Sequence, residues 1–155
     1  MRHTRQVRIS LASDELTGIA VILPAELSER GHYVLLHGAL AEDESADWAQ
    51  ASAAAAQDVV DGNADQAIVC CWTGTGAAIA ANKLRGVRAA LCADAVTAAG
   101  ARRWNDANVL ALSLRATADA ELAEILDAWF RTPASEEDAD RASIARVGQL
   151  ENGGS

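Results

Sequence analysis

A short segment near the middle of the chain combines two thiols with a glycine-rich loop. The segment reads CCWTGTGAAIAANK and runs from Cys70 to Lys83. Its apolar beginning is typical of a strand end, and its alanine-rich part predicts a helix. Because side chains alternate between the two faces of a strand, Cys70 and Cys71 must point in opposite directions. We expect Cys71, the last residue of the strand, to reach a ligand crevice and Cys70 to pack as a small apolar side chain.

The loop after Cys71 could stabilise negative charge. The free backbone N–H groups at the start of the following helix, together with the helix dipole, can form an anion site. Thiolates are favoured beside such a site, and the same N–H groups could bind an oxyanion that forms during a reaction. A thiolate with an oxyanion hole fits acyl transfer through a thioester, or proton abstraction next to a carbonyl. Acyl transfer needs a histidine partner, and only His37 is placed suitably for that role. A third alternative is that Cys71 is an inert buried cysteine in an ordinary turn.

Composition and length restrict the class of protein. The 155 residues suit one domain with one core, so we expect a single domain over residues 1–150 and a mobile tail over 151–155. The net charge of −9 argues against nucleic acid as a partner. No apolar run approaches the roughly 20 residues of a membrane span, and the sequence MRHTRQVRIS lacks the apolar region of a secretory signal, which predicts a cytoplasmic protein. The cysteines and histidines lack metal-ligand spacing, so neither a metal nor a cofactor is expected.

Apolar runs of strand length alternate with helical patterns along the chain. Strands are expected over 6–13, 33–38, 66–71, 88–93 and 108–114, and helices over 17–31, 45–62, 77–84, 95–104, 119–130 and 135–150. This alternation predicts a Rossmann-like α/β fold, a three-layer α/β/α sandwich with a five-stranded parallel sheet. Ligands bind outside the carboxyl ends of such strands. Ser45 is expected to cap the second helix and Gly62 to end it, and Pro24 to kink or restart the first.

Longer stretches of the sequence resemble a known family of enzymes. CWTGTGAAIAANKLRGVRAALCAD and ARRWNDANVLALSLR resemble the type B ribose-5-phosphate isomerases and the related galactose-6-phosphate isomerase subunits. Those proteins carry a C-G-T-G-x-G loop, an A-A-N-K-x-x-G-x-R-A-A-L stretch and an H-N-D-A-N-V-L segment. SDELTG near the start is similar to their S-D-H-A-G, and EILDAWF to their closing helix. The resemblance covers residues 7–147 in the same order.

The resemblance implies a metal-independent aldose–ketose isomerase that works through a cis-enediolate. Cys71 would be the base that moves a proton between C1 and C2. Family members that lack this cysteine use a glutamate just after the loop as the base, and that position is Ala77 here. Thr73 and the backbone around it would stabilise the enediolate, and Asp14 would hold substrate hydroxyls. Asn105 would contact the sugar from the partner subunit, because the family forms dimers with active sites at the interface, so a homodimer or a tetramer is expected. The expected catalytic residues are Cys71, Thr73 and Asp14, and the expected substrate-binding residues are Ser13, Trp72, Gly74, Thr75, Gly76, Trp104, Asn105, Arg115, Arg141 and Arg146.

The sequence departs from the family pattern at several of these positions. Trp104 replaces the histidine that opens a sugar ring, and Trp72 replaces the glycine after the catalytic cysteine. Glu15 replaces a histidine of the first loop and should repel a phosphate. Arg141 and Arg146 are five residues apart, whereas the family's arginine pair is four apart. The family's tyrosine before the second long helix has no counterpart in EDESADWA.

These departures share one explanation if the substrate never closes a ring. A four-carbon sugar phosphorylated at O4 has no hydroxyl placed to form a furanose, and Trp72 and Trp104 would narrow the pocket. We therefore expect a short open-chain substrate similar to a tetrose phosphate. An unphosphorylated short sugar, ribose 5-phosphate itself and a non-catalytic role in ligand binding are the alternatives. Both tryptophans could instead pack at an interface, and the helical patterns predict that Trp48 and Trp129 belong to the core.

Overall fold

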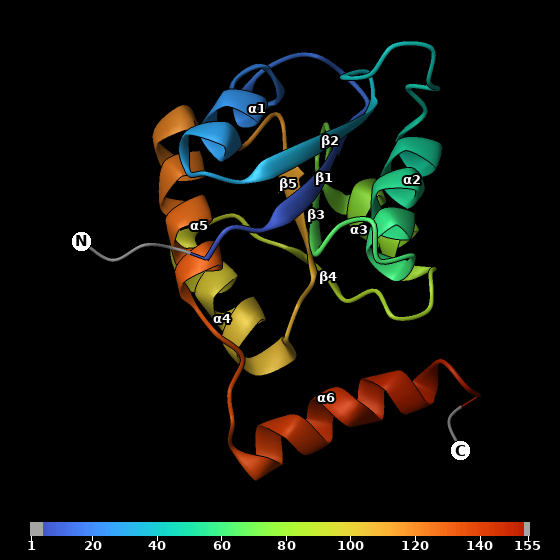
Figure 1. The fold of residues 1–155 in the computed structure, drawn as a ribbon, viewed down its shortest axis with the longest axis vertical. Helices are drawn as coiled ribbons and strands as arrows, with labels where there is room; N and C mark the ends of the chain where they lie inside the picture. Colours follow the sequence, from blue (N-terminus) through green and yellow to red (C-terminus); the bar gives the residue numbers. More distant parts are fainter. Residues whose placement is uncertain (1–4, 154–155) are drawn as a thin grey trace.

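The computed structural model describes residues 5–153 and confirms the predicted alternation of strands and helices (Figure 1). Its elements are β1 (Arg8–Ser13), α1 (Ile19–Glu29), β2 (Tyr33–Gly38), α2 (Trp48–Val60), β3 (Gln66–Cys71), α3 (Thr75–Asn82), β4 (Ala89–Leu91), α4 (Ala95–Asn105), β5 (Val109–Ser113), α5 (Asp119–Arg131) and α6 (Asp138–Leu150). None of the helices in this part of the chain is long and apolar enough to span a membrane.

The five strands form one parallel sheet in the order β2-β1-β3-β5-β4. Helices α1, α4 and α5 cover one face of the sheet, and α2 and α3 cover the other (Figure 1). The predicted three-layer α/β/α sandwich is thus confirmed. The helices that follow the neighbouring strands β1 and β3 pack on opposite faces, so a crevice is expected between the carboxyl ends of these two strands.

The two faces of the sheet are packed with side chains of different size. The side of α1, α4 and α5 is filled by large residues such as Leu112, Ile125 and Trp129, which confirms that Trp129 is a core residue. The opposite side is built mainly of alanines, with Val69 and Val109 among them. Small side chains let α2 and α3 lie close to the sheet, and this close approach fixes the position of the loop that precedes α3.

The starts of two helices and the course of a third differ from the sequence prediction. The helix α1 runs unbroken through Pro24, so no restart occurs there. Asp47 caps α2 by accepting a hydrogen bond from the Gln50 N–H at 2.9 Å, and the predicted cap, Ser45, instead accepts one from the Asp47 N–H. Gly62 follows the end of α2 with a φ of 80°, as predicted. The last helix begins at Asp138 rather than near residue 135, because acidic side chains in the first turn favour its dipole there.

Helix α6 lies outside the layers and buries none of its own side chains within the described chain (Figure 1). Val147 and Leu150 are exposed on it. Its carboxyl end is connected to the body by a hydrogen bond from the Gly86 N–H to Glu151 Oε1 at 2.9 Å. Glu151 is the first residue of the predicted tail, whose last two residues, 154 and 155, lie outside the described residues.

Candidate active site

The structure brings the two main candidate residues together at the carboxyl ends of β1 and β3. Ser13 lies opposite Cys70 in the register of these parallel strands. The next residues, Asp14 and Cys71, therefore follow at the same level, on neighbouring strands whose spacing is about 4.8 Å. This is the switch point of the sheet, and it lies at the carboxyl ends of the strands, where the sequence predicted a ligand site.

The Asp14 carboxylate is partly buried and incompletely satisfied. Its Oδ1 is inaccessible to solvent and has no hydrogen-bond partner within residues 5–153. Burial, together with the negative charges of Glu15 and Asp47, raises the pKa of Asp14 above its ordinary value. A buried acceptor without a donor is costly, so a hydroxyl group of a ligand would stabilise this carboxylate.

The two thiols lie on opposite faces of β3, as strand geometry predicted. Cys70 belongs to the large-residue core, where burial raises the pKa of its thiol far above the ordinary range. Cys71 lies on the alanine-rich face, in the same core as Ala12 and Ala77, and is 6% exposed. The Cys71 thiol is thus almost completely covered within one chain, and it lines neither of the two cavities described below.

Hydrogen bonds from β5 hold the loop that follows Cys71. The Trp72 carbonyl oxygen accepts a bond from Ser113 Oγ at 2.9 Å and another from the Arg115 N–H at 3.0 Å. These bonds place Arg115, whose side chain is exposed, directly beside the loop. Trp72 itself is 54% exposed, so its ring is available to form part of a pocket wall.

The next part of the loop requires a glycine. Gly74 has a φ of 80°, and a Cβ at this position would lie 2.9 Å from the Leu112 carbonyl carbon. The close approach positions Thr73 and Thr75, whose hydroxyl groups are 2.7 Å apart and both exposed. Gly74 also precedes α3 without a side-chain cap. The first N–H groups of α3 therefore have no partner within the helix and are available to an oxyanion.

Trp48 lies beside this loop, a position that its place in the sequence did not predict. A Cβ on Gly76 would lie 2.8 Å from Trp48 Cε3, so the ring covers the space that a larger residue would fill. Trp48 is 44% exposed, and its assignment to the core is wrong. Trp48 lies in the first turn of α2, and helical periodicity alone cannot distinguish a position beside the loop from packing in the core.

Ser13 contributes to the shape of the first loop. Its side chain is fully buried, and its Oγ donates a hydrogen bond to the Glu15 carbonyl oxygen at 2.6 Å and accepts one from the Glu15 N–H at 3.3 Å. The hydroxyl group is therefore engaged inside its own turn. Ser13 holds the backbone on either side of Asp14, rather than presenting its oxygen to a ligand.

His37 does not lie beside the candidate thiol. It pairs with Ala12 across β2 and β1, so β1 separates it from Cys71 on β3. Its Nε2 lies 2.7 Å from Asp58 Oδ2 and its Nδ1 2.8 Å from Glu44 Oε1. Burial lowers the pKa of His37, but these two carboxylates outweigh it and raise the pKa above the ordinary value. The possible histidine partner for acyl transfer is thus engaged elsewhere.

Four of the expected site residues lie away from Cys71 in the same chain. Trp104 and Asn105 end α4, which leads from the carboxyl end of β4 to the amino end of β5. Strands of five to six residues span about 17–20 Å, so these side chains lie at the opposite edge of the sheet. Both line a cavity of about 280 Å³ between α4 and α6, together with Ile144 and Val147.

The other two expected site residues that lie away from Cys71 are arginines of α6. Arg141 and Arg146 are both exposed. Five residues of an α-helix correspond to a rotation of about 140° around the axis, so the two side chains leave different faces of α6. At most one of them can face a given site, as the altered spacing in the sequence indicated.

Comparison with known proteins connects this geometry to a family. The family model described as Ribose/Galactose Isomerase matches residues 9–148. Ribose-5-phosphate isomerase B of Escherichia coli is 41% identical over 68% of this chain and 70% of its own length. The 4-deoxy-4-sulfo-D-erythrose isomerase of a Clostridium species is 34% identical over 68% of this chain and 67% of its own length.

A solved structure agrees over nearly the whole fold. Ribose-5-phosphate isomerase B of Mycoplasma genitalium, with bound ribulose 5-phosphate, superimposes with a TM-score of 0.82 at 29% identity and covers 94% of this chain and 95% of its own. The all-parallel sheet, the order of the motifs and the extent of the family match lead to one conclusion. The chain belongs to the ribose/galactose isomerase family and is a sugar-phosphate aldose–ketose isomerase of that family.

Proposed function

We propose that the protein interconverts a short, open-chain aldose phosphate and the corresponding ketose, with Cys71 as the base. The observation that carries this proposal is the unsatisfied Asp14 Oδ1 next to Cys71 at the switch point. A polyhydroxy substrate supplies the hydroxyl donor that Asp14 lacks. It also places the carbon next to its carbonyl group beside the thiol.

The proposed reaction moves one proton between neighbouring carbons. The Cys71 thiolate removes the proton from C2 of the aldose, and the electron pair of that C–H bond forms the C1–C2 double bond of an enediolate with its negative charge on O1. The N–H groups at the start of α3 stabilise this charge. Return of the proton to C1, with transfer of the O2 hydroxyl proton to O1, gives the ketose and regenerates the thiolate.

The chain length of the substrate follows from the residues around the site. Trp72 is half exposed beside the catalytic loop, and Trp48 occupies the space next to Gly76. Bulky walls favour a short substrate, and neither histidine of the described residues, His32 or His37, is placed to open a ring. A relative that is 34% identical to this chain is named for a four-carbon sulfonated sugar. A tetrose 4-phosphate meets these conditions because its O4 is blocked and the sugar stays open-chain.

Incubation with erythrose 4-phosphate in deuterated water tests the proposal. We expect conversion to the ketose with solvent deuterium at C1, and deuterium at C2 of the recovered aldose, because the proton on a thiol exchanges with water. Mass spectrometry and proton NMR measure the label. Ribose 5-phosphate is the matched comparison and should show a lower kcat/KM. A ketose without solvent label, or faster turnover of ribose 5-phosphate, would contradict the proposal.

A second copy of the chain is expected to complete the site. Trp104 and Asn105 lie at the opposite sheet edge from Cys71 and therefore cannot contact the same small substrate within one chain. Within the part of the chain that the structure describes, helix α6 buries no side chain of its own, and it exposes Val147 and Leu150. A helix of 13 residues is marginal in water without a packed face. We infer a homodimer in which α6 and the end of α4 from one chain reach the carboxyl edge of the other.

Mixed dimers of two inactive variants test this arrangement. Cys71→Ala and Asn105→Ala should each be nearly inactive alone. After the two proteins are unfolded and refolded together, about one site in each mixed dimer should contain both native residues, so that activity returns. Each variant refolded alone is the control. Recovery of no activity, with mixed dimers demonstrated by mass spectrometry, would show that Asn105 does not act across an interface.

A further inference from the structure

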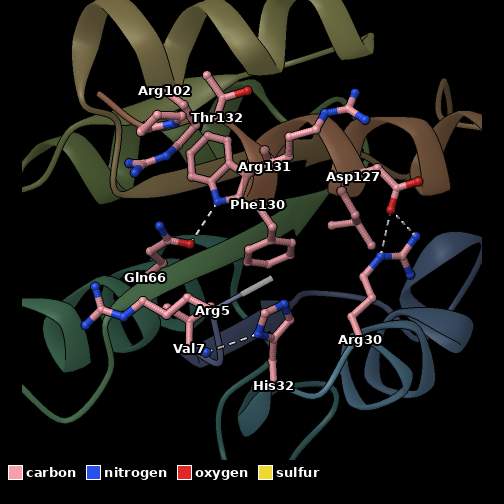
Figure 2. Close-up of a pocket in the computed structure, with 13 residues that line it drawn as sticks. Arg5, Val7, Arg30, His32, Gln66, Arg102, Asp127, Phe130, Arg131 and Thr132 are labelled. Carbon is pink, nitrogen blue, oxygen red and sulfur yellow. Dashed lines mark hydrogen bonds and ion pairs between the residues drawn. The ribbon is translucent and has the colours of Figure 1, made fainter. Parts of the chain in front are cut away.

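We propose that a second site, at the amino edge of the sheet, binds a small organic phosphate. A cavity of about 670 Å³ lies there, between the beginnings of β1 and β3 and the carboxyl end of α5 (Figure 2). Its volume is within the usual range for small-molecule sites. It is lined by other residues than those of the candidate active site, which lies at the opposite edge.

Two buried hydrogen-bond donors that line this cavity have no partner among the described residues. His32 is 5% exposed, and its Nδ1 accepts a hydrogen bond from the Val7 N–H at 3.1 Å. The neutral ring therefore carries its proton on Nε2, and this donor is unpaired within the described chain. Arg102 Nε is a second buried donor without a partner among residues 5–153. Unsatisfied donors from two separate elements at one cavity indicate an acceptor ligand.

Further donors surround the same space. Gln66 Oε1 accepts a hydrogen bond from Trp129 Nε1 at 2.9 Å, which orients the Gln66 side-chain NH₂ group as an additional donor. Figure 2 shows His32 and Gln66 directed toward the middle of the cavity, with arginines around its rim. Arg5 and Arg131 are exposed at this rim and form no ion pair within the described residues.

The residues that line the cavity carry a net positive charge, whereas the protein as a whole carries a net negative charge. The chain has a net charge of −9, yet four arginines line this cavity against the single carboxylate of Asp127. Arg30 is neutralised by Asp127 at 3.0 Å and by Glu26 at 2.6 Å. Arg5, Arg102 and Arg131 remain to attract an anion. Asp106, 3.4 Å from Arg102, offsets part of the charge of Arg102, and the Asp65 carboxylate offsets part of the charge of Arg5.

A phosphate monoester fits this set of groups. It carries nearly two negative charges and three strong acceptor oxygens, and guanidinium groups match phosphate oxygens in bidentate geometry. The other side of the cavity is apolar, with Val7, Leu126, Phe130 and Pro133. Phe130 lies against the His32 ring at a centroid distance of 4.2 Å. An apolar wall beside a cluster of donors favours an anion that carries an organic group over inorganic phosphate.

The indole N–H resonances of the intact protein can separate this site from the active site. Trp129 reports on the amino-edge cavity, whereas Trp48 and Trp72 report on the carboxyl edge. Glycerol 2-phosphate is a suitable probe because it has no carbonyl group and cannot be isomerised, and inorganic phosphate is the comparison. We expect saturable shifts of the Trp129 indole and the His32 ring at millimolar ester, with weaker binding of inorganic phosphate.

Paired variants complete the test. The double variant Arg5→Ala/Arg131→Ala removes two exposed side chains and should weaken the binding seen at Trp129 at least about tenfold, as expected for lost charged hydrogen bonds. Arg85→Ala, a change of charge in the loop before β4, should leave it unchanged. The proposal is wrong if Trp129 and His32 do not respond, if inorganic phosphate binds as tightly as the ester, or if the double variant binds like the wild type. The Trp72 resonance reports on the active site separately. Failure of phosphate binding at Trp129 would therefore not contradict the isomerase proposal.

Discussion

Replacement of Cys71 by alanine is expected to remove isomerase activity while the fold is retained. Cys71 is 6% exposed and belongs to the same alanine-rich core as Ala12 and Ala77, so alanine fits the site and leaves only a small cavity. A general base typically contributes about 10²- to 10⁴-fold to the rate, and the loss should lie in kcat. Solvent deuterium exchange into the substrate should fall in parallel, because it depends on the same proton transfer.

Cys70→Ala is the matched control for this experiment. The two thiols are neighbours in the sequence, but Cys70 lies in the opposite core, where burial raises its pKa and keeps the thiol protonated. Its replacement should cost stability through lost packing and leave kcat nearly unchanged. Equal loss of activity in both variants would show that packing of β3, rather than the Cys71 sulfur, determines the rate.

Replacement of Gly38 by alanine is expected to destabilise the protein by about 2–5 kcal/mol. Gly38 ends β2 with a φ of 69°, and a Cβ there would collide with the Ser13 carbonyl oxygen and lie 2.8 Å from the Cβ of Ala51. The left-handed backbone costs about 1–2 kcal/mol for alanine. Forcing an extra methyl group into a packed site adds about 1–3 kcal/mol. Urea unfolding followed by tryptophan fluorescence measures the sum.

Gly62→Ala separates the two contributions to this effect. Gly62 has a φ of 80°, but a Cβ there would meet no atom within 4 Å. It should therefore cost only the backbone strain of about 1–2 kcal/mol. If both variants lose the same stability, the approach of β2 to Ser13 and α2 is not as tight as the structure indicates.

The sequence was most informative where apolar patterning dominates. Continuous apolar runs such as those ending at Cys71 and Leu114 predicted buried parallel strands, and their order along the chain predicted the three layers. Helix ends were less predictable because several capping residues compete locally. Ser45 and Asp47 can both accept from backbone N–H groups, and Asp47 caps α2 because its carboxylate reaches Gln50.

The candidate site was predictable only in part. Strand alternation correctly separated Cys70 from Cys71, and the family resemblance assigned Asp14 to the same site. Trp48 could not be predicted, because its contact with Gly76 depends on how closely α2 approaches α3. Ser13 looked like a binding residue by its motif, yet its hydroxyl group is engaged by Glu15. Such local hydrogen bonds depend on backbone geometry that periodicity does not contain.

The difference in side-chain size between the two cores also limits which positions of this enzyme can change during evolution. In the core beneath α1, α4 and α5, a larger side chain at one position can be compensated by a smaller one at a neighbouring position. Ala51, Ala55 and Ala77 on the other side are fully or nearly fully buried and have no methylene groups to give up. Any enlargement there displaces a helix as a rigid body, and with it Trp48 or the turn at Gly74. Adaptation to new substrates is therefore directed toward exposed loop positions such as 72 and 115, which can change without moving the scaffold.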